Sequence, residues 1–189
     1  LLGPRFLSGG AVTESVVLLC FGYGYSARAF AELFKSQAQA TIGTRRSPAD
    51  ARALAALGVE GHVFGRGNPL AAETIARATH VLVSIPPEDA GDPVLAEHGH
   101  NLARAAATIR WVGYLSTTAV YGDRGGDWVD ETSELRPVGA RGHRRVEAER
   151  GWLDLFQKHR LPVHIFRLAG IYGPGRNAIE QVRAGTARR

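Results

Sequence analysis

Short apolar runs alternate with longer amphipathic segments along the chain. The apolar runs predict strands at Val16–Phe21, Ala40–Thr44, Gly61–Phe64, His80–Ile85, Arg110–Ser116 and Val163–Leu168. The segments between them predict helices at Ala27–Phe34, Ala49–Leu57, Ala71–Ala78, Val94–Thr108 and Arg141–His159. Strands that alternate with helices are typical of a parallel sheet with helices on both faces. We therefore expect an α/β fold, with six strands in one doubly wound parallel sheet.

The helix predicted at Ala49–Leu57 has the clearest boundary signals. Ser47 is a good N-cap, Pro48 suits the first helical position, and Asp50 can accept the free amides of the first turn. Gly58 can adopt the left-handed conformation that ends a helix.

Composition indicates a folded domain without metal or disulfides. The 189 residues are 44% hydrophobic and 22% charged, which is enough apolar material for a core. Cys20 is the single cysteine, so no internal disulfide can form, and no Cys and His residues have metal-ligand spacing. The apolar run at Val16–Phe21 is too short to span a bilayer and lacks the flanks of a secretory signal. We expect a cytoplasmic protein.

The net charge of +5 does not by itself indicate a nucleic-acid partner. No basic run is interleaved with aromatic residues, so we expect neither nucleic acid nor a membrane as partner. The chain contains no methionine. We therefore expect a fragment of a longer protein.

The first chemical motif follows the first predicted strand directly. It comprises Gly22, Tyr23, Gly24, Tyr25, Ser26 and Ala27. In a strand–loop–helix unit, the first glycine permits a tight turn, the second lets the backbone approach a pyrophosphate, and a small third residue packs the helix on the strand. The helix N-terminus then supplies free amides to the phosphates. This motif predicts a Rossmann-type dinucleotide site, although a simple connecting turn would have the same glycines.

The end of the second predicted strand bears on which dinucleotide binds. An acidic residue there would accept the ribose hydroxyls of NAD. The sequence instead has Thr44, Arg45 and Arg46. Two guanidinium groups can hold a 2′-phosphate through charge-assisted hydrogen bonds, so we expect NADP, with NAD less favoured. The alternative is that both arginines are solvated loop charges.

Three further motifs resemble the extended branch of the short-chain dehydrogenase/reductase family, the NAD(P)-dependent epimerases and dehydratases. The chain is similar to that branch at Leu115–Asp123, at Pro162–Gly175, and in the helix that contains Asn101 and Leu102. The resemblance covers nearly the whole chain. It implies a NAD(P)-binding domain over residues 1–175, and the start of a truncated C-terminal substrate region over residues 176–189.

The resemblance also implies site residues. Thr117 occupies the position at which the family places a Ser or Thr that hydrogen-bonds the substrate oxygen, so Thr117 is the catalytic candidate. The alternative is a strand-end threonine that only bonds backbone. Candidate cofactor contacts are the glycine motif, Thr44, Arg45, Arg46, the stiff loop at Ser84, Ile85 and Pro86, and the segment under the nicotinamide at Leu168, Ala169 and Ile171.

The sequence departs from the family at its catalytic Tyr and Lys. Arg141 and Arg145 occupy those two positions, and a guanidinium cannot act as a general base at neutral pH. Arg145 can still hold ribose hydroxyls, and Arg141 can bind an anionic substrate. The alternative is that Arg141, Arg145 and Glu149 form a solvated charge stripe at i, i+4 spacing.

Two functions follow from these expectations. The first is an atypical NADP-dependent oxidoreductase or epimerase that acts on a carbonyl or sugar-like small molecule. The second is a catalytically silent NADP-binding regulator or scaffold. The oligomeric state, including a homodimer, stays open.

Overall fold

A computed structural model of the chain describes residues 15–186. Six parallel strands form one sheet in the order β3-β2-β1-β4-β5-β6. The strands are β1 (Val16–Phe21), β2 (Ala38–Arg45), β3 (Glu60–Val63), β4 (His80–Val83), β5 (Trp111–Thr117) and β6 (Val163–Leu168). This order is that of the doubly wound dinucleotide-binding sheet, so the predicted fold class is confirmed. The first fourteen residues of the predicted domain 1–175, and the last three of the predicted continuation 176–189, lie outside the described residues.

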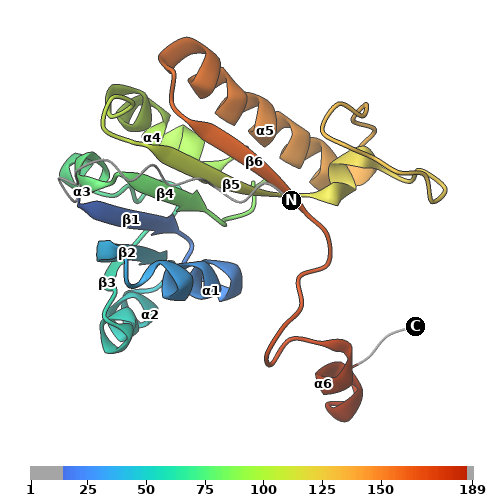
Figure 1. The fold of residues 1–189 in the computed structure, drawn as a ribbon, viewed down its shortest axis with the longest axis horizontal. Coiled ribbons are helices and arrows are strands. Elements are labelled where there is room, and N and C mark those ends of the chain that lie inside the picture. Colours follow the sequence, from blue (N-terminus) through green and yellow to red (C-terminus); the bar gives the residue numbers. More distant parts are fainter. Residues whose placement is uncertain (1–14, 187–189) are drawn as a thin grey trace, which may run out of the picture.

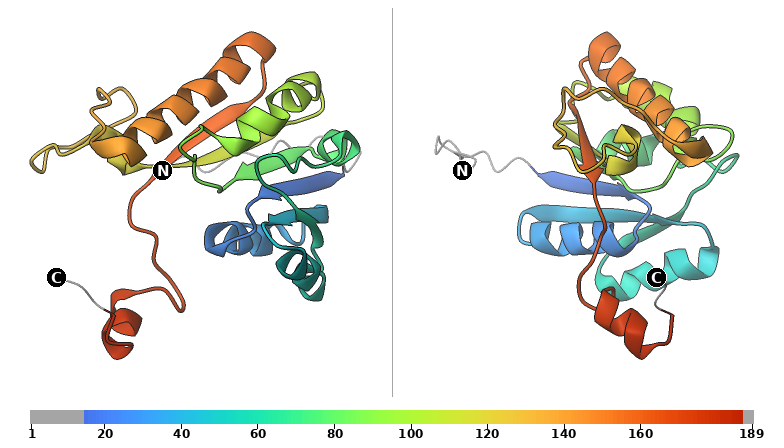
Figure 2. Two further views of the ribbon diagram at one scale, coloured as in Figure 1. Left: turned by 180° about the vertical axis from the view of Figure 1, so that it is seen from behind. Right: turned by 90° about the vertical axis from the view of Figure 1, so that its right-hand side faces the viewer.

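Helices cover both faces of the sheet (Figure 1). The α-helices are α1 (Tyr25–Phe34), α2 (Pro48–Ala53), α3 (Ala72–Arg77), α4 (Pro93–Arg104), α5 (Gly139–His159) and α6 (Ala178–Arg183). Two short 3₁₀ helices, η1 (Leu54–Leu57) and η2 (Thr118–Tyr121), follow α2 and β5. Figure 2 shows α1 and α2 on one side of the sheet and α4 and α5 on the other, with α6 standing apart from the sheet.

Strand β1 shows how the alternation of side chains builds the two layers. Leu18 and Cys20 pack in one buried cluster with Ala27 of α1, whereas Leu19 and Phe21 belong to the cluster formed with α3, α4 and α5. These four side chains of β1 are fully buried. Because successive side chains point to opposite faces, an apolar run without polar interruptions identifies a central strand that is covered on both sides.

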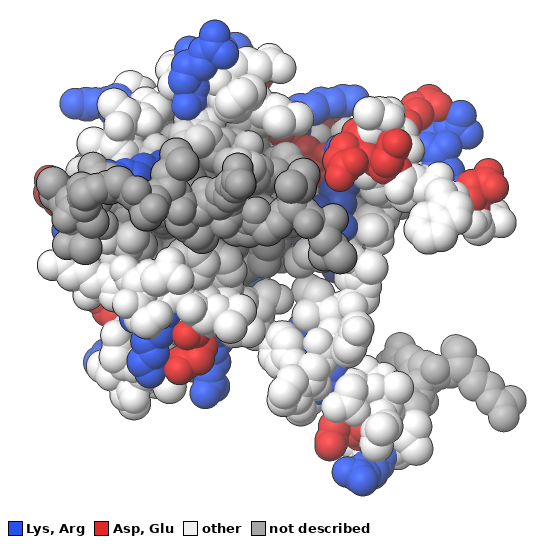
Figure 3. All heavy atoms as spheres, viewed as in Figure 1, with Lys and Arg blue, Asp and Glu red and all other residues white. Residues whose placement is uncertain are grey.

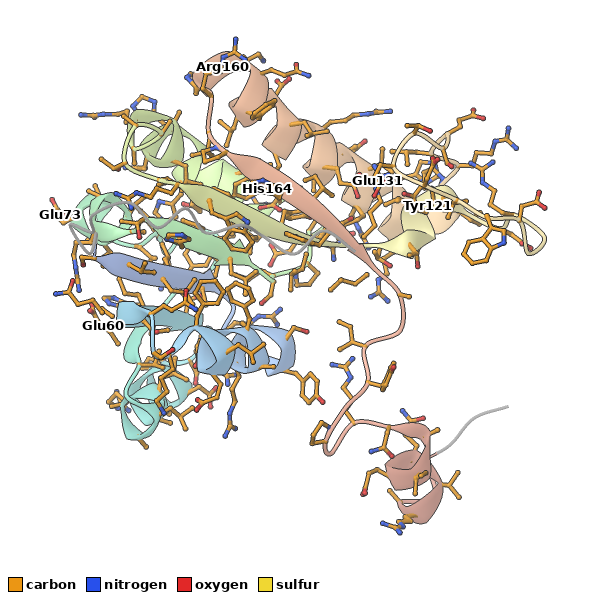
Figure 4. All side chains as sticks on the ribbon, in the orientation of Figure 1. Glu60, Glu73, Tyr121, Glu131, Arg160 and His164 are labelled. Carbon is orange, nitrogen blue, oxygen red and sulfur yellow. The ribbon has the colours of Figure 1, made fainter. Side chains whose placement is uncertain are left out.

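Boundary chemistry explains where several helices begin and end. The Ser47 hydroxyl accepts from the Asp50 amide at 3.1 Å, Pro48 is the first residue of α2, and Gly58 has a φ of 71°, so these three predicted signals are confirmed. The Asp50 carboxylate accepts from the Ser47 hydroxyl and not, as predicted, from a free amide of the first turn. Asp92 caps α4 by accepting from the amides of Val94 and Leu95. At the far end of α5, Arg160 takes a left-handed φ of 59°, and it lies at the turn into β6 in Figure 4.

All the predicted strands and helices are present. Strands β1 and β6 have the predicted bounds, and the bounds of the other elements are shifted. The helix predicted at 94–108 ends at Arg104, because the Ala105 carbonyl accepts from the amides of Thr108 and Ile109 and from the Thr108 hydroxyl. This tight turn brings the chain into β5. The second predicted helix divides into α2 and η1, while η2 and α6 were not predicted.

Charges of both signs are mixed over the face shown in Figure 3. Within residues 15–186, no helix combines the length and the apolar character needed to cross a bilayer.

Two glycines allow a test of the packing between β3 and α2. A Cβ at Gly61 would run into the carbonyl oxygen of Ala51, whereas a Cβ at Gly99 in α4 would meet no atom within 4 Å. Gly61→Ala should lower the free energy of unfolding by about 2–3 kcal/mol through overpacking. Gly99→Ala should raise it by about 0.5–1 kcal/mol because alanine restricts the unfolded chain and favours helix. Urea denaturation of both variants measures the difference, and equal effects would contradict the packing described.

Candidate functional site at the carboxyl ends of the strands

The glycine corner after β1 is held from both sides. The Gly22 amide donates to the Thr44 hydroxyl at 2.7 Å, and the Tyr23 amide donates to the Thr44 carbonyl at 2.9 Å. Directly after β4, the Ser84 hydroxyl donates to the Gly22 carbonyl at 2.5 Å. Gly22 has a φ of 84°, and a Cβ there would lie 2.8 Å from the Ile85 side chain. Only glycine fits this position, as the motif predicted.

Gly24 leaves open space in front of helix α1. A Cβ at Gly24 would meet no atom within 4 Å. Gly24 is the N-cap of the helix and offers no side chain to the first-turn amides, so the positive end of the helix dipole faces this space. Ala27 is fully buried against β1, which brings the helix close to the sheet. The corner has the shape that a pyrophosphate needs.

A first cavity of about 430 Å³ lies on the β2 and β3 side of the corner. Its walls contain several predicted cofactor contacts, namely Gly22, Tyr23, Gly24, Thr44, Arg45, Arg46, Ser84, Ile85 and Pro86. Phe64, Gly65 and Pro93 also line it and were not predicted. Tyr23 and Thr44 are buried, so their side chains support the wall, while Arg45 and Arg46 are exposed at its edge.

A second cavity of about 400 Å³ adjoins the first. It shares Gly24 and Ser84 with the first cavity, and these residues follow β1 and β4, the two strands at which the strand order reverses. Open α/β sheets bind ligands at this switch point. The second cavity is lined by Tyr25, Ser26, Leu115, Ser116, Thr117, Arg141, Arg145, Leu168, Ala169, Gly170, Ile171 and Arg176 in addition to the shared pair. The predicted contacts at Leu168, Ala169 and Ile171 therefore face the same space as Thr117.

Thr117 lies in the wall of the second cavity, where its hydroxyl also bonds backbone. Its Oγ accepts from the Ala119 amide at 3.2 Å and so caps η2. The hydroxyl proton is still available for donation, because this contact uses only an oxygen lone pair.

Arg145 is buried in the second cavity and anchored to β5. Its side chain is 8% exposed, and Nη1 donates to the Tyr114 hydroxyl and the Leu115 carbonyl, each at 2.9 Å. Burial raises the pKa of Tyr114, with the nearby Arg145 opposing that shift, so the phenol stays protonated. Arg141 lines the same cavity from the first turn of α5 and is exposed.

Glu149 completes a buried ion pair beneath the cavity. Arg167 donates Nη2 to Glu149 Oε2 at 2.8 Å, and the Ser116 hydroxyl donates to Glu149 Oε1. Arg167 also donates to the Tyr121 hydroxyl at 2.8 Å, and Figure 4 shows Tyr121 beyond the end of β5. The side chains of Arg167 and Glu149 are 17% and 2% exposed, so a solvated stripe of Arg141, Arg145 and Glu149 is wrong. The pair instead ties α5 to β5 and β6.

The sequence analysis missed two arginines of this region. Arg167 carries a signal, because it is the one charged side chain in the apolar part of the last predicted strand. Arg176 carries none, since it follows a Gly- and Pro-rich loop; here Cζ of Arg176 lies 5.5 Å from the centre of the Tyr25 ring. Within residues 15–186, no group of three or more His, Cys, Asp or Glu side chains is arranged to hold a metal ion.

Comparison with known proteins finds solved structures of similar fold. No protein-family model matches the chain, and no curated protein does. A conserved protein of unknown function from Silicibacter pomeroyi is 48% identical, with a TM-score of 0.77 over 86% of this chain and 56% of its own. UDP-glucuronic acid 4-epimerase from Bacillus cereus, solved with NAD, is 16% identical, with a TM-score of 0.65 over 88% of this chain and 60% of its own. A Methylobacillus flagellatus protein provisionally described as an NAD-dependent epimerase/dehydratase is 25% identical, with a TM-score of 0.59 over 90% of this chain and 59% of its own.

The chain has the fold of the NAD-dependent epimerase/dehydratase family. This finding confirms the resemblance read from the sequence motifs. The chain spans 56% to 60% of the length of the three structures described, so it corresponds to part of an epimerase/dehydratase fold. Arg141 and Arg145, which the sequence analysis predicted at the positions of the family's Tyr and Lys, both lie on α5 and line the second cavity.

The buried pair allows a test of what holds this fold together around the site. Arg167→Met should lower the free energy of unfolding by about 3–5 kcal/mol, because Glu149 would be left buried without its cation. Glu149 raises the pKa of Arg167, so the native cation persists over the working pH range. Chemical denaturation measures the loss.

A matched surface pair serves as control for this test. Arg77 bonds Glu60 at 2.8 Å, but these side chains are 50% and 40% exposed. Arg77→Met should therefore lower the free energy of unfolding by less than about 1 kcal/mol. Similar losses for Arg167→Met and Arg77→Met would contradict a structural role for the buried pair.

Proposed function

We propose that the chain binds a nicotinamide dinucleotide across the two adjoining cavities. The open space at Gly24 carries this proposal, because it lies between the cavities and in front of the first-turn amides of α1. A pyrophosphate at Gly24 would direct the adenosine half toward Arg45 and the nicotinamide half toward Thr117. The B. cereus epimerase solved with NAD supports the cofactor class.

We propose NADP as the preferred form. Arg45 and Arg46 stand at the edge of the first cavity, where the adenosine ribose would lie. Neither is ion-paired with a carboxylate among residues 15–186, so both guanidinium groups are free to meet a 2′-phosphate. Asp50 also lines this cavity, and its Oδ2 already accepts from the Ser47 hydroxyl at 2.7 Å.

The reaction that fits this arrangement is an NADP-dependent oxidation–reduction or epimerisation of a carbonyl or sugar-like small molecule. The bound nicotinamide would exchange a hydride with the substrate carbon. Thr117 would orient the substrate by donating its hydroxyl proton to the reacting oxygen. Leu168, Ala169 and Ile171 would form the apolar support beneath the nicotinamide ring.

The composition of the second cavity favours an alternative. Its described lining contains no His, Asp, Glu or Lys, and its single phenol, Tyr25, donates to the Pro174 carbonyl at 3.2 Å. A site without an ordinary general base also suits a protein that binds NADP as a regulator or scaffold and does not turn it over. NADPH oxidation against carbonyl compounds and nucleotide sugars separates the two: tight binding without turnover supports the regulator.

The Gly24 position provides a direct test of cofactor binding. Gly24→Val should abolish binding of both NADP and NAD, because the side chain would fill the space proposed for the pyrophosphate. The fold should persist, since the added Cβ meets no atom within 4 Å. Isothermal titration measures affinity and circular dichroism checks the fold. Gly99→Ala is the control, and unchanged affinity in Gly24→Val would remove the dinucleotide assignment.

The two exposed arginines test the preference between cofactors. Replacing Arg45 and Arg46 together by Ala should weaken the binding of NADPH by about 100-fold and that of NADH by less than about threefold, because only NADPH carries the 2′-phosphate. Competitive titration of both dinucleotides gives the ratio. Arg52→Ala, an exposed arginine in α2 outside the cavity, should change neither affinity. A loss that is equal for NADH and NADPH would refute the phosphate contact.

A further inference from the structure

The second cavity is strongly positive. Arg141, Arg145 and Arg176 line it, and no Asp or Glu is among its described lining residues. A smaller cavity of about 230 Å³ adjoins it behind Pro86 and shares Arg141 and Arg145 with it. The two arginines therefore form a common wall of both spaces.

Arg145 is a buried cation without an ion-pair partner within residues 15–186. Among these residues, its hydrogen bonds go to the neutral Tyr114 hydroxyl and Leu115 carbonyl. The nearby carboxylates are engaged elsewhere: Asp92 accepts from helix amides and from Trp152, and Glu149 accepts from Arg167 and Ser116. A guanidinium that is 8% exposed and has no counterion carries a desolvation penalty, which a bound anion would offset.

Arg141 adds a second charge on the same face. It precedes Arg145 by one turn of α5, so the two side chains project toward the same region, and like charges at this spacing repel. Arg144 differs, because it pairs with Asp89. Arg176 reaches the cavity from the loop after β6, and its Cζ lies 5.5 Å from the centre of the Tyr25 ring.

We propose that Arg141 and Arg145 bind an anionic group of the substrate, a carboxylate or a phosphate, inside the second cavity. The proposal rests on the proposed function and narrows its substrate class to acidic sugars or similar acidic small molecules. Guanidinium groups bind both anions through paired N–H donors, and binding would supply the counterion that Arg145 lacks. Arg176, from the loop after β6, would add a third positive charge.

Saturation-transfer NMR with three sugars tests the site. D-glucuronate carries a carboxylate, glucose 6-phosphate carries a phosphate, and glucose is the neutral match. Each is titrated into the chain saturated with NADPH. We expect saturable binding of at least one charged sugar, with the stronger of the two identifying the anion, and at least about tenfold weaker binding of glucose.

Variants link that binding to the two arginines. Arg141→Gln should weaken binding of the charged sugar by about tenfold or more. It should not disturb the fold, because Arg141 is exposed and forms no hydrogen bond or ion pair with another residue of 15–186. Arg145→Lys retains the charge but loses the planar guanidinium with its paired N–H donors, so we expect a partial loss of affinity for the charged sugar. Arg150→Gln, an exposed residue of the same helix outside the cavity, is the control.

The outcomes separate this proposal from the cofactor assignment. NADPH binding without preference for a charged sugar, or a preference that Arg141→Gln leaves unchanged, overturns the anion site alone. Displacement of NADPH by the charged sugar also overturns it, because the arginines would then hold a cofactor phosphate. Absence of NADPH binding in the unmodified chain overturns the proposed function instead.

Discussion

The clamp on Gly22 is the constraint on which the site depends. Thr44 at the end of β2 holds the Gly22 amide, and Ser84 after β4 holds its carbonyl, so one peptide corner joins both halves of the sheet. The left-handed φ and the close approach of Ile85 leave no room for a side chain. Because this corner is fixed, Gly24 and the start of α1 are presented to the crevice in one orientation. The two cavities exist on either side of that fixed point.

The buried Glu149–Arg167 pair plays a comparable part on the other half of the sheet. It joins the crossover helix α5 to the edge strand β6, and through Ser116 it reaches the end of β5. A buried pair of this kind contributes less to net stability than to geometry, since desolvation offsets much of the attraction. Here it fixes the face of α5 that carries Arg141 and Arg145. The proposed anion site therefore depends on a pair that never contacts the ligand.

Local patterns in the sequence were enough to predict the sheet and the glycine corner. Strand β1 is apolar on both faces, and Gly22 and Ser47 occupy positions where backbone geometry limits the residue type. Such signals act over a few residues, so they survive without knowledge of tertiary contacts. Helix ends were less accurate, because the turn at Ala105 depends on hydrogen bonds that compete with the helical pattern.

The sequence could not predict which charged side chains around the second cavity have an ion-pair partner. Spacing alone places Arg141, Arg145 and Glu149 on one helix face, yet their surroundings differ completely. Glu149 meets Arg167 from β6, which is distant in sequence, while Arg145 finds only neutral acceptors on β5. Helical periodicity contains no information about which strand will supply a partner, and that partner decides whether a buried charge is neutralised.

Tyr25 connects helix α1 to the loop that follows β6. Its main chain belongs to the first turn of α1, while its hydroxyl bonds Pro174 and its ring lies under Arg176. The adjacent Gly173 comes so close that any side chain there would collide with the Tyr25 hydroxyl. Because the Tyr25 side chain contacts both Pro174 and Arg176, a displacement of α1 would also shift its contacts with the loop that follows β6.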